Sequence, residues 1–198
     1  MLAADKVMAS TAQRVLVIAS DMRTAAPRSA MEANFGDGAA AFVVSAGEHL
    51  ARFEERHSRT NELLDVWRSE DDRYVQSWED RFVVKHGYLE NTSAVVSALL
   101  EKAGIDATDI NTAALYAPDA RSHRSLARKL GIENAVDPMF GHLGNCGSAF
   151  APLLLIAALE KARAGERILV AAYGDGADAL LLRVEAQADG RSGLLGLS

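Results

Sequence analysis

One short stretch of the chain, residues 141–149, gathers side chains that could carry out acid–base or nucleophilic chemistry. Its sequence is Gly-His-Leu-Gly-Asn-Cys-Gly-Ser-Ala, with the imidazole of His142, the carboxamide of Asn145 and the thiol of Cys146. An apolar run at residues 150–159 follows directly and is long enough for a buried helix. Backbone N–H groups at the start of a helix have no intrahelical partner, so this loop could stabilise a developing negative charge. The alternative is that the glycines only close a loop that caps a core helix.

Length and composition define the class of protein. The chain has 198 residues, of which 49% are hydrophobic and 24% charged, as in a globular protein of one large or two small domains. The net charge of −6 and the absence of a basic cluster argue against nucleic-acid binding. A single cysteine excludes an internal disulfide framework and suits the cytoplasm. Since no apolar run reaches the roughly 18–20 residues that span a bilayer, we expect a soluble cytoplasmic protein without a membrane partner.

A sequence pattern near the N-terminus returns near the C-terminus. Arg-Val-Leu-Val at residues 14–17 matches Arg-Ile-Leu-Val at 167–170, and Phe-Gly-Asp-Gly-Ala at 35–39 matches Tyr-Gly-Asp-Gly-Ala at 173–177. A helical stretch precedes each copy. The two glycine turns also fit a relaxed dinucleotide-binding fingerprint, but the apolar, partly β-branched residues after them favour strands over the helix that such a site needs. The pattern therefore predicts a duplicated half-domain.

Helices and strands alternate along the chain and must position the loop at 141–149. This order indicates an α/β fold with a mostly parallel sheet. The continuous apolar run of the first strand is typical of a strand buried on both faces. Asp119 is suited to cap the helix that follows it. The predicted helices are 1–12, 91–103, 120–130 and 148–162, and the predicted strands are 14–20, 35–44, 111–117, 167–173 and 174–184.

Residues 51–86 are the polar and aromatic part of the chain. This segment holds both tryptophans, Trp67 and Trp78, and we expect a surface insertion at about 60–86 whose aromatic side chains are anchored in the core. A role of these rings in a substrate channel or a dimer contact is the alternative. The last residues, 187–198, contain glycine and serine and are predicted to be a flexible tail.

With these residues assembled, the chain resembles the thiolase-fold condensing enzymes, above all hydroxymethylglutaryl-CoA synthase-like and ketoacyl synthase III-like proteins. Three segments carry the resemblance: residues 14–41, residues 116–131 and residues 144–177. The resemblance implies a duplicated fold layered α-β-α-β-α. In such a fold residues 1–50 would be the end of the N-terminal half, and residues 51–186 would be the C-terminal half.

The resemblance also implies a chemistry. In this family a cysteine nucleophile takes an acyl group from CoA or an acyl-carrier protein. A histidine with an asparagine, or two histidines, then polarise the thioester carbonyl while a carbon–carbon bond forms. This implies an acyltransferase that acts on a thioester substrate and needs no further cofactor and no metal.

Site residues are carried over position by position. Asn145 matches the family's asparagine, and His142 lies in a loop similar to the Gly-His-Pro-Leu-Gly loop of thiolases, so these two are the candidate catalytic residues. Tyr116 occupies the position of the family's catalytic histidine. Cys146 occupies the position of the threonine in the family's Gly-Asn-Thr stretch. The candidate substrate-binding residues are Tyr116, Gly144, Cys146 and Gly147.

The family's nucleophile has no counterpart in the chain. By the internal repeat it would lie just before residue 1, so we expect the C-terminal portion of a longer enzyme, or a chain whose missing half is another subunit. Its sheet would then lack a neighbour, which predicts a homodimer or a hetero-oligomer. The segment with Trp67 and Trp78 resembles a subgroup whose partner carries a zinc ribbon and an OB domain. A non-catalytic, thiolase-like subunit and a nucleophilic Cys146 are the alternatives.

Overall fold

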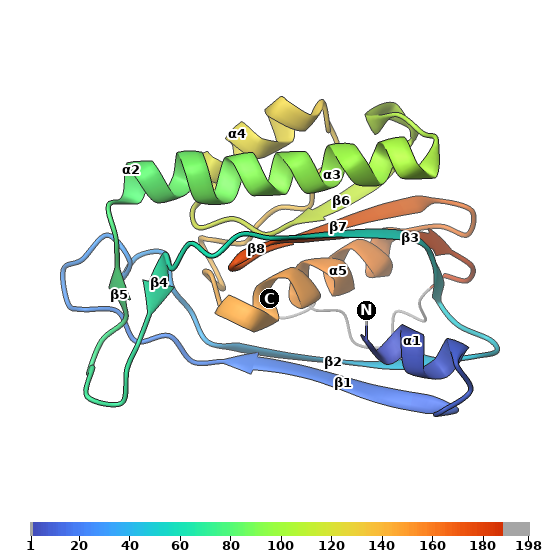
Figure 1. The fold of residues 1–198 in the computed structure, drawn as a ribbon, viewed down its shortest axis with the longest axis horizontal. Coiled ribbons are helices and arrows are strands. Elements are labelled where there is room, and N and C mark those ends of the chain that lie inside the picture. Colours follow the sequence, from blue (N-terminus) through green and yellow to red (C-terminus); the bar gives the residue numbers. More distant parts are fainter. Residues whose placement is uncertain (1, 188–198) are drawn as a thin grey trace.

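The structure is a computed structural model that describes residues 2–187. Its elements form layers, which Figure 1 shows from the side. Helices α3 (Glu90–Ala103) and α4 (Ala120–Leu130) cover one face of a four-stranded sheet, and α5 (Phe150–Lys161) lies on the other face. A two-stranded sheet of β1 (Arg14–Asp21) and β2 (Gly38–Ser45) lies beyond α5. This α-β-α-β order confirms the predicted thiolase-like layering.

The remaining elements complete the chain. They are α1 (Leu2–Met8), β3 (Ala51–Thr60), β4 (Val66–Trp67), β5 (Gln76–Ser77), α2 (Asp80–Phe82), the π-helical segment η1 (Val83–Leu89), the 3₁₀ turns η2 (Ala107–Asp109) and η3 (Gly147–Ala149), and strands β6 (Thr112–Leu115), β7 (Arg167–Tyr173) and β8 (Gly176–Val184). The predicted helices and strands are present, with α1 and β6 shorter than expected. Asp119 caps α4 as predicted, because its Oδ1 accepts hydrogen bonds from the backbone N–H groups of Arg121 and Ser122, each at 2.8 Å.

The prediction of a mostly parallel sheet is wrong. The strand order is β3-β8-β7-β6, and only β6 and β7 are parallel. β7 and β8 form an antiparallel hairpin because the Gly-Asp-Gly turn reverses the chain, with φ of +47° at Asp175 and +118° at Gly176. The fourth strand, β3, then pairs antiparallel with β8.

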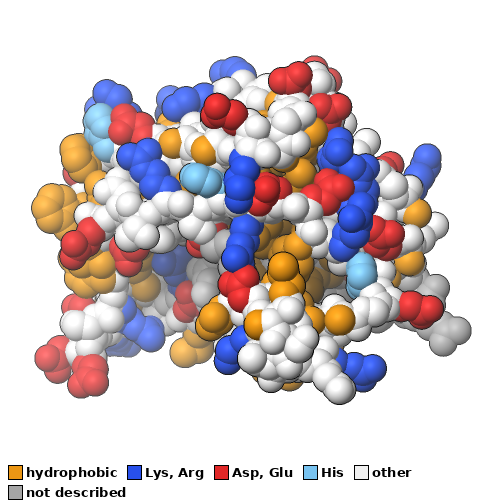
Figure 2. All heavy atoms as spheres, turned by 45° about the vertical axis from the view of Figure 1, so that its right-hand side comes forward, with side chains coloured by type: hydrophobic (Ala, Val, Ile, Leu, Met, Phe, Trp, Pro, Cys, Tyr) orange, Lys and Arg blue, Asp and Glu red, His pale blue; other side chains and the backbone are white. Residues whose placement is uncertain are grey.

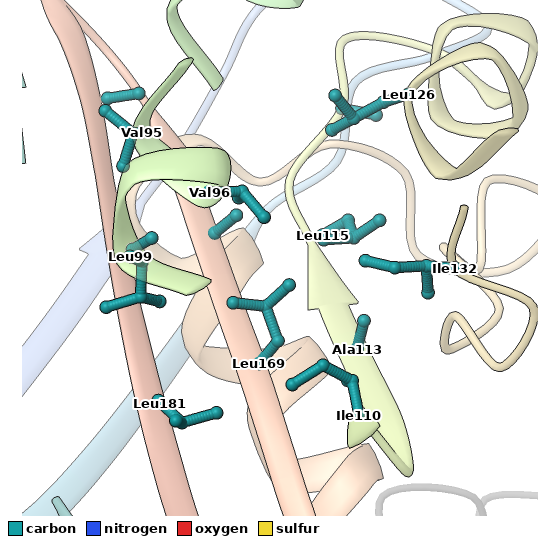
Figure 3. Close-up of a cluster of buried hydrophobic side chains, with 14 of the residues drawn as sticks. Val95, Val96, Leu99, Ile110, Ala113, Leu115, Leu126, Ile132, Leu169 and Leu181 are labelled. Carbon is teal, nitrogen blue, oxygen red and sulfur yellow. The ribbon is translucent and has the colours of Figure 1, made fainter. Parts of the chain in front are cut away.

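The core of the four-stranded sheet has two sides. On the side of α3, Leu169 and Leu181 pack against Val95, Val96 and Leu99, which are all at most 1% exposed (Figure 3). On the opposite side, alternate residues of β7 and β8 pack against α5. Each of the two central strands is therefore buried on both faces, which explains their nearly continuous apolar sequences.

The expectation that the first strand is buried on both faces is wrong. Leu16 and Ile18 of β1 are 61% and 66% exposed, and Val43, which pairs with Leu16 across the sheet, is 64% exposed. The opposite face of this sheet packs on α5, where Ala40 is buried. Within residues 2–187, nothing covers the outer face that contains Leu16, Ile18 and Val43.

The middle of the chain also differs from the prediction. Residues 51–60 form the edge strand β3, and its charged residues suit an edge that faces solvent. Trp78 is 62% exposed, so it does not anchor the segment in the core, whereas Trp67 is partly buried in the short β4–β5 hairpin. The predicted tail lies outside the described residues from residue 188 onward.

Candidate functional site

Asn145 is the centre of the candidate site. It is 1% exposed, and a backbone bridge joins it to Phe35, at the end of the loop between β1 and β2. Its Nδ2 donates a hydrogen bond to the carbonyl of Ala117 at 2.9 Å. Its Oδ1 accepts hydrogen bonds from the backbone N–H of Gly147 at 2.9 Å and from Nη1 of Arg23 at 3.1 Å. The carboxamide is therefore held on both sides.

Tyr116 lies beside Asn145 at the carboxyl end of β6. The structure therefore brings together two residues that the sequence analysis placed in one site. Burial raises the pKa of the Tyr116 hydroxyl, and hydrogen bonds from Asn145 and Arg23 and the positive charge of Arg23 only partly oppose this effect. Tyr116 therefore stays a neutral phenol, which has a proton to donate.

Two further tyrosines surround Tyr116. The ring of Tyr173, at the end of β7, is 6.2 Å from the Tyr116 ring, and the ring of Tyr88 is 6.4 Å away. The Tyr88 hydroxyl donates to the backbone carbonyl of Tyr116 at 2.8 Å. Tyr88 comes from the π-helical segment η1, where Gly87 leaves room for the Tyr173 hydroxyl, since a Cβ there would overlap it.

Asp65 adds an acidic group on the same side. Burial raises the pKa of this carboxyl, while the N–H of Val66, which donates to it at 2.6 Å, and the charge of Arg23 act in the opposite direction. Burial raises the pKa of Tyr173, and the charge of the Asp65 carboxylate raises it further. Tyr173 in turn lowers the pKa of Asp65. The buried hydroxyl of Tyr173 has no hydrogen-bond partner.

Glycines let the two copies of the repeat approach each other here. A Cβ on Gly36 would overlap the carbonyl of Leu143, and a Cβ on Gly147 would overlap the carboxylate of Asp21. Gly144 has a φ of +75°, and a Cβ at this position would overlap the backbone of Phe35. The Gly-Asp-Gly turn of the first copy is thus in contact with the loop at 141–149.

Cys146 is buried among the apolar side chains under α5. A Cβ on Gly38 would lie 2.8 Å from its Sγ, so β2 covers the thiol closely. Burial raises the pKa of this thiol, and the charges of Asp21 and Asp37 raise it further, against the opposite effect of Arg23. This environment favours the thiol over the thiolate that a nucleophile requires.

His142 lies away from this cluster. It is exposed in a turn in which its N–H donates to the carbonyl of Met139 at 3.0 Å. The structure does not bring its ring to Asn145 or Tyr116, so its catalytic role stays a prediction.

Sequence reasoning missed Arg23, Asp65 and Tyr173. They come from three segments that are distant in the sequence, and no spacing or motif connects them. The one available signal was the position of Tyr173 at the end of a strand, equivalent to that of Tyr116 in the parallel neighbour. Carboxyl ends of parallel strands meet at one edge of a sheet, which is where α/β proteins place ligands.

The surface and the metal-binding potential add little to this site. On the face in Figure 2, Lys and Arg side chains are interspersed with Asp and Glu. Among residues 2–187, no cluster of His, Cys, Asp and Glu could hold a metal ion. No helix in that range is long and apolar enough to cross a membrane.

Two models of one known enzyme family match separate parts of this chain. A model described as 3-Oxoacyl-[acyl-carrier-protein (ACP)] synthase III matches residues 1–61, and the model of the C terminal part of the same enzyme matches residues 100–184. The chain belongs to the thiolase-fold condensing enzymes. The resemblance inferred from the sequence is thereby confirmed.

Individual relatives agree with this family. Hydroxymethylglutaryl-CoA synthase of Methanothermobacter thermautotrophicus is 32% identical over 174 residues, which are 85% of this chain and 50% of that protein. The synthase of Methanopyrus kandleri is 32% identical over 165 residues, 82% of this chain and 47% of that one. The crystal structure of 3-oxoacyl-[acyl-carrier-protein] synthase III from Aquifex aeolicus superposes with a TM-score of 0.80 at 25% identity, over 92% of this chain and 61% of that one.

This chain spans about half the length of the two curated relatives named above. A structure of HMG-CoA synthase complexed with CoA shares its fold with a TM-score of 0.80 at 19% identity. The enzymes named in these comparisons transfer acyl groups.

Proposed function

We propose that this chain provides one part of the active site of an acyltransferase that forms or cleaves a carbon–carbon bond next to a thioester, with CoA or an acyl-carrier protein as the acyl carrier. The observation that carries the proposal is the position of the buried carboxamide of Asn145 beside the Tyr116 hydroxyl in a chain of this family. Claisen chemistry places negative charge on the thioester carbonyl oxygen, and fixed N–H and O–H donors stabilise that charge. Nδ2 of Asn145 and the Tyr116 hydroxyl are such donors.

The nucleophile in this proposal is a cysteine outside residues 1–198. Its thiolate attacks the thioester carbonyl, the acyl group moves to the cysteine, and CoA leaves as a thiolate that takes up a proton. Cys146 suits this step poorly because it is buried and its pKa is raised. Gly144, Cys146 and Gly147 instead shape the loop that keeps Asn145 close to the carbonyl.

The part of the enzyme that supplies the cysteine, either further residues of a longer polypeptide or another subunit, covers the outer face of the β1–β2 sheet. The equivalent face of β7 and β8 is covered by α3, and the repeat leads us to expect helices of similar kind over Leu16, Ile18 and Val43. A second copy of the chain and a zinc-ribbon/OB-fold protein are the other partners that the sequence suggests. A cytoplasmic location stays a prediction.

The partner proposal is tested with Ile18→Lys, which places a charge on this face. We expect the variant to fold normally and to be lost from the native assembly in analytical ultracentrifugation, because a buried unpaired charge opposes association. Arg28→Gln, an exposed change in the following loop, is the control. If Ile18→Lys assembles like the wild type, this face is not the interface.

The catalytic proposal is tested by acylation. The native assembly is incubated with isotope-labelled acetyl-CoA, and the acylated peptide is mapped by mass spectrometry. We expect an acyl-cysteine in the partner sequence and none on Cys146. Acylation of Cys146 would contradict the assignment of the nucleophile, and absence of any acyl-enzyme together with absence of turnover would contradict the proposed activity.

A non-catalytic subunit is the second candidate function, and the observation in its favour is the phenol of Tyr116 where the family has a histidine. In that case the chain stabilises a complete synthase. Its removal from the assembly would then leave acyl transfer by the remaining subunits intact.

A further inference from the structure

Arg23 is a basic side chain that hydrogen-bonds to Asn145. It comes from the loop after β1 and is only 13% exposed. Its guanidinium carbon lies 4.5 Å from the centre of the Phe35 ring, and its Nε lies 3.9 Å from the carboxylate of Asp21. Its backbone N–H donates to Asp37 at 3.0 Å, which ties the loop down at the same point. A buried, stacked arginine with several partners is held in one conformation.

The contacts of Asn145 define which way its carboxamide faces. A carbonyl oxygen has two acceptor positions, and on Oδ1 these are filled by Nη1 of Arg23 at 3.1 Å and the N–H of Gly147 at 2.9 Å. One N–H of Nδ2 is bound to the carbonyl of Ala117 at 2.9 Å. The second N–H of Nδ2 is directed toward the Tyr116 hydroxyl, which has a proton of its own to donate.

Arg23 and the backbone define this arrangement together. A guanidinium and a backbone N–H only donate hydrogen bonds, so the atom of Asn145 that faces Arg23 and Gly147 has to be the oxygen. A flipped carboxamide would place its NH₂ group against these two donors and its oxygen against the carbonyl of Ala117. Such buried unpaired donors are unfavourable.

We propose that Arg23 is a positioning residue of the reaction centre: its guanidinium helps to fix the carboxamide of Asn145 so that the second N–H of Nδ2 faces the Tyr116 hydroxyl and the expected position of the thioester carbonyl. This inference rests on the proposed acyltransferase function. It adds a residue from the first copy of the repeat to a site built from the second.

Arg23→Gln tests the proposal, because glutamine keeps a polar side chain but offers Asn145 an acceptor as well as a donor. Displaced reacting groups cost enzymes about 10²-fold in rate, so we expect kcat of the native assembly to fall by about 10- to 100-fold with KM within about twofold. Arg23→Lys keeps a pure donor and the charge, and restores part of kcat. Arg28→Gln, in the same loop and exposed, behaves as the wild type.

A second measurement does not depend on catalysis. The side-chain amide protons of Asn145 are followed by ¹⁵N NMR in the chain alone. We expect Arg23→Gln to shift or merge these two signals, while Arg23→Lys and Arg28→Gln leave them separate. If the Asn145 signals and kcat are both unchanged in Arg23→Gln, the positioning role is wrong; if the wild-type assembly has no turnover but the signals shift as expected, the proposed function fails and the positioning of Asn145 holds.

Discussion

The two copies of the repeat share two short sequence motifs, but their outer faces have different surroundings. Leu169 of β7 is fully buried against α3, whereas Leu16, at the equivalent position of β1, is 61% exposed. The inner faces of the β1–β2 and β7–β8 pairs are more alike, because both of them pack on α5. The difference shows that an apolar run encodes a strand that needs two covered faces, whereas the cover itself comes from other parts of the fold.

The comparison also distinguishes a polar cluster that stabilises the fold from one that could bind a ligand. In the second copy, Glu54 accepts hydrogen bonds from Arg167 at 3.0 Å and Arg183 at 2.8 Å, so each of its carboxylate oxygens is paired with a guanidinium. Arg14, the counterpart of Arg167, is exposed on the first copy. Around Asn145, by contrast, the Tyr173 hydroxyl is buried without a partner. A polar cluster with an unmatched group is what a ligand-binding site needs before its ligand arrives.

The largest difference between the copies is expected for the matched leucines. Leu169→Ala should lower the free energy of unfolding by about 3 kcal/mol, since it leaves a cavity against α3, and Leu16→Ala by less than about 0.5 kcal/mol. Urea unfolding of the isolated chain measures both. Equal losses would mean that the outer face of β1 is buried in solution.

The matched glycines give the next largest difference. A Cβ on Gly36 would overlap the carbonyl of Leu143, whereas a Cβ on its counterpart Gly174 meets no atom within 4 Å. Gly36→Ala should therefore destabilise the chain by about 1–3 kcal/mol, and Gly174→Ala by much less. Thermal unfolding of the two variants decides this, and a neutral Gly36→Ala would show that the two copies are not in close contact.

The smallest difference concerns the ion pairs of Glu54. Burial alone would raise the pKa of Glu54, but the hydrogen bonds from Arg183 and Arg167 outweigh it and lower the pKa. Because the folded-state pKa is depressed, the stabilisation is complete above the ordinary glutamate pKa of about 4.3 and is lost as the pH falls through the folded-state value.

Glu54→Gln should therefore cost about 1 kcal/mol at pH 7, and its deficit relative to the wild type should shrink below about pH 4. Unfolding in urea at several pH values gives this deficit. Glu48→Gln, on an exposed loop, serves as the control. A deficit that is independent of pH would exclude the charge of Glu54 as its cause.

Much of the fold could be predicted from local sequence. Apolar runs and glycine turns predicted the strands β7 and β8, although not their antiparallel pairing. Asp119 marked the start of α4 because capping depends on adjacent residues. The edge strand β3 was missed because its alternating charges resemble a loop. The exposure of β1 was missed because its sequence contains no information about the missing cover.

The site was only half predictable. Asn145 and Tyr116 were found through the family resemblance, and the structure places them together. Arg23 and Asp65 lie in loops whose approach to Asn145 depends on the whole fold. The exposed position of His142 likewise follows from the turn at Met139, which the glycines alone did not reveal.

Turnover of acyl-CoA by the native assembly with Asn145→Ala tests the central claim most directly, with Asn134→Ala, an exposed asparagine, as the matched control. Removal of one donor from an oxyanion site lowers kcat by about 10²- to 10³-fold, and we expect a loss in this range with KM little changed and with the assembly intact. Asn134→Ala should keep wild-type turnover. Full turnover by an intact Asn145→Ala assembly would contradict the assignment of this loop to the reaction centre.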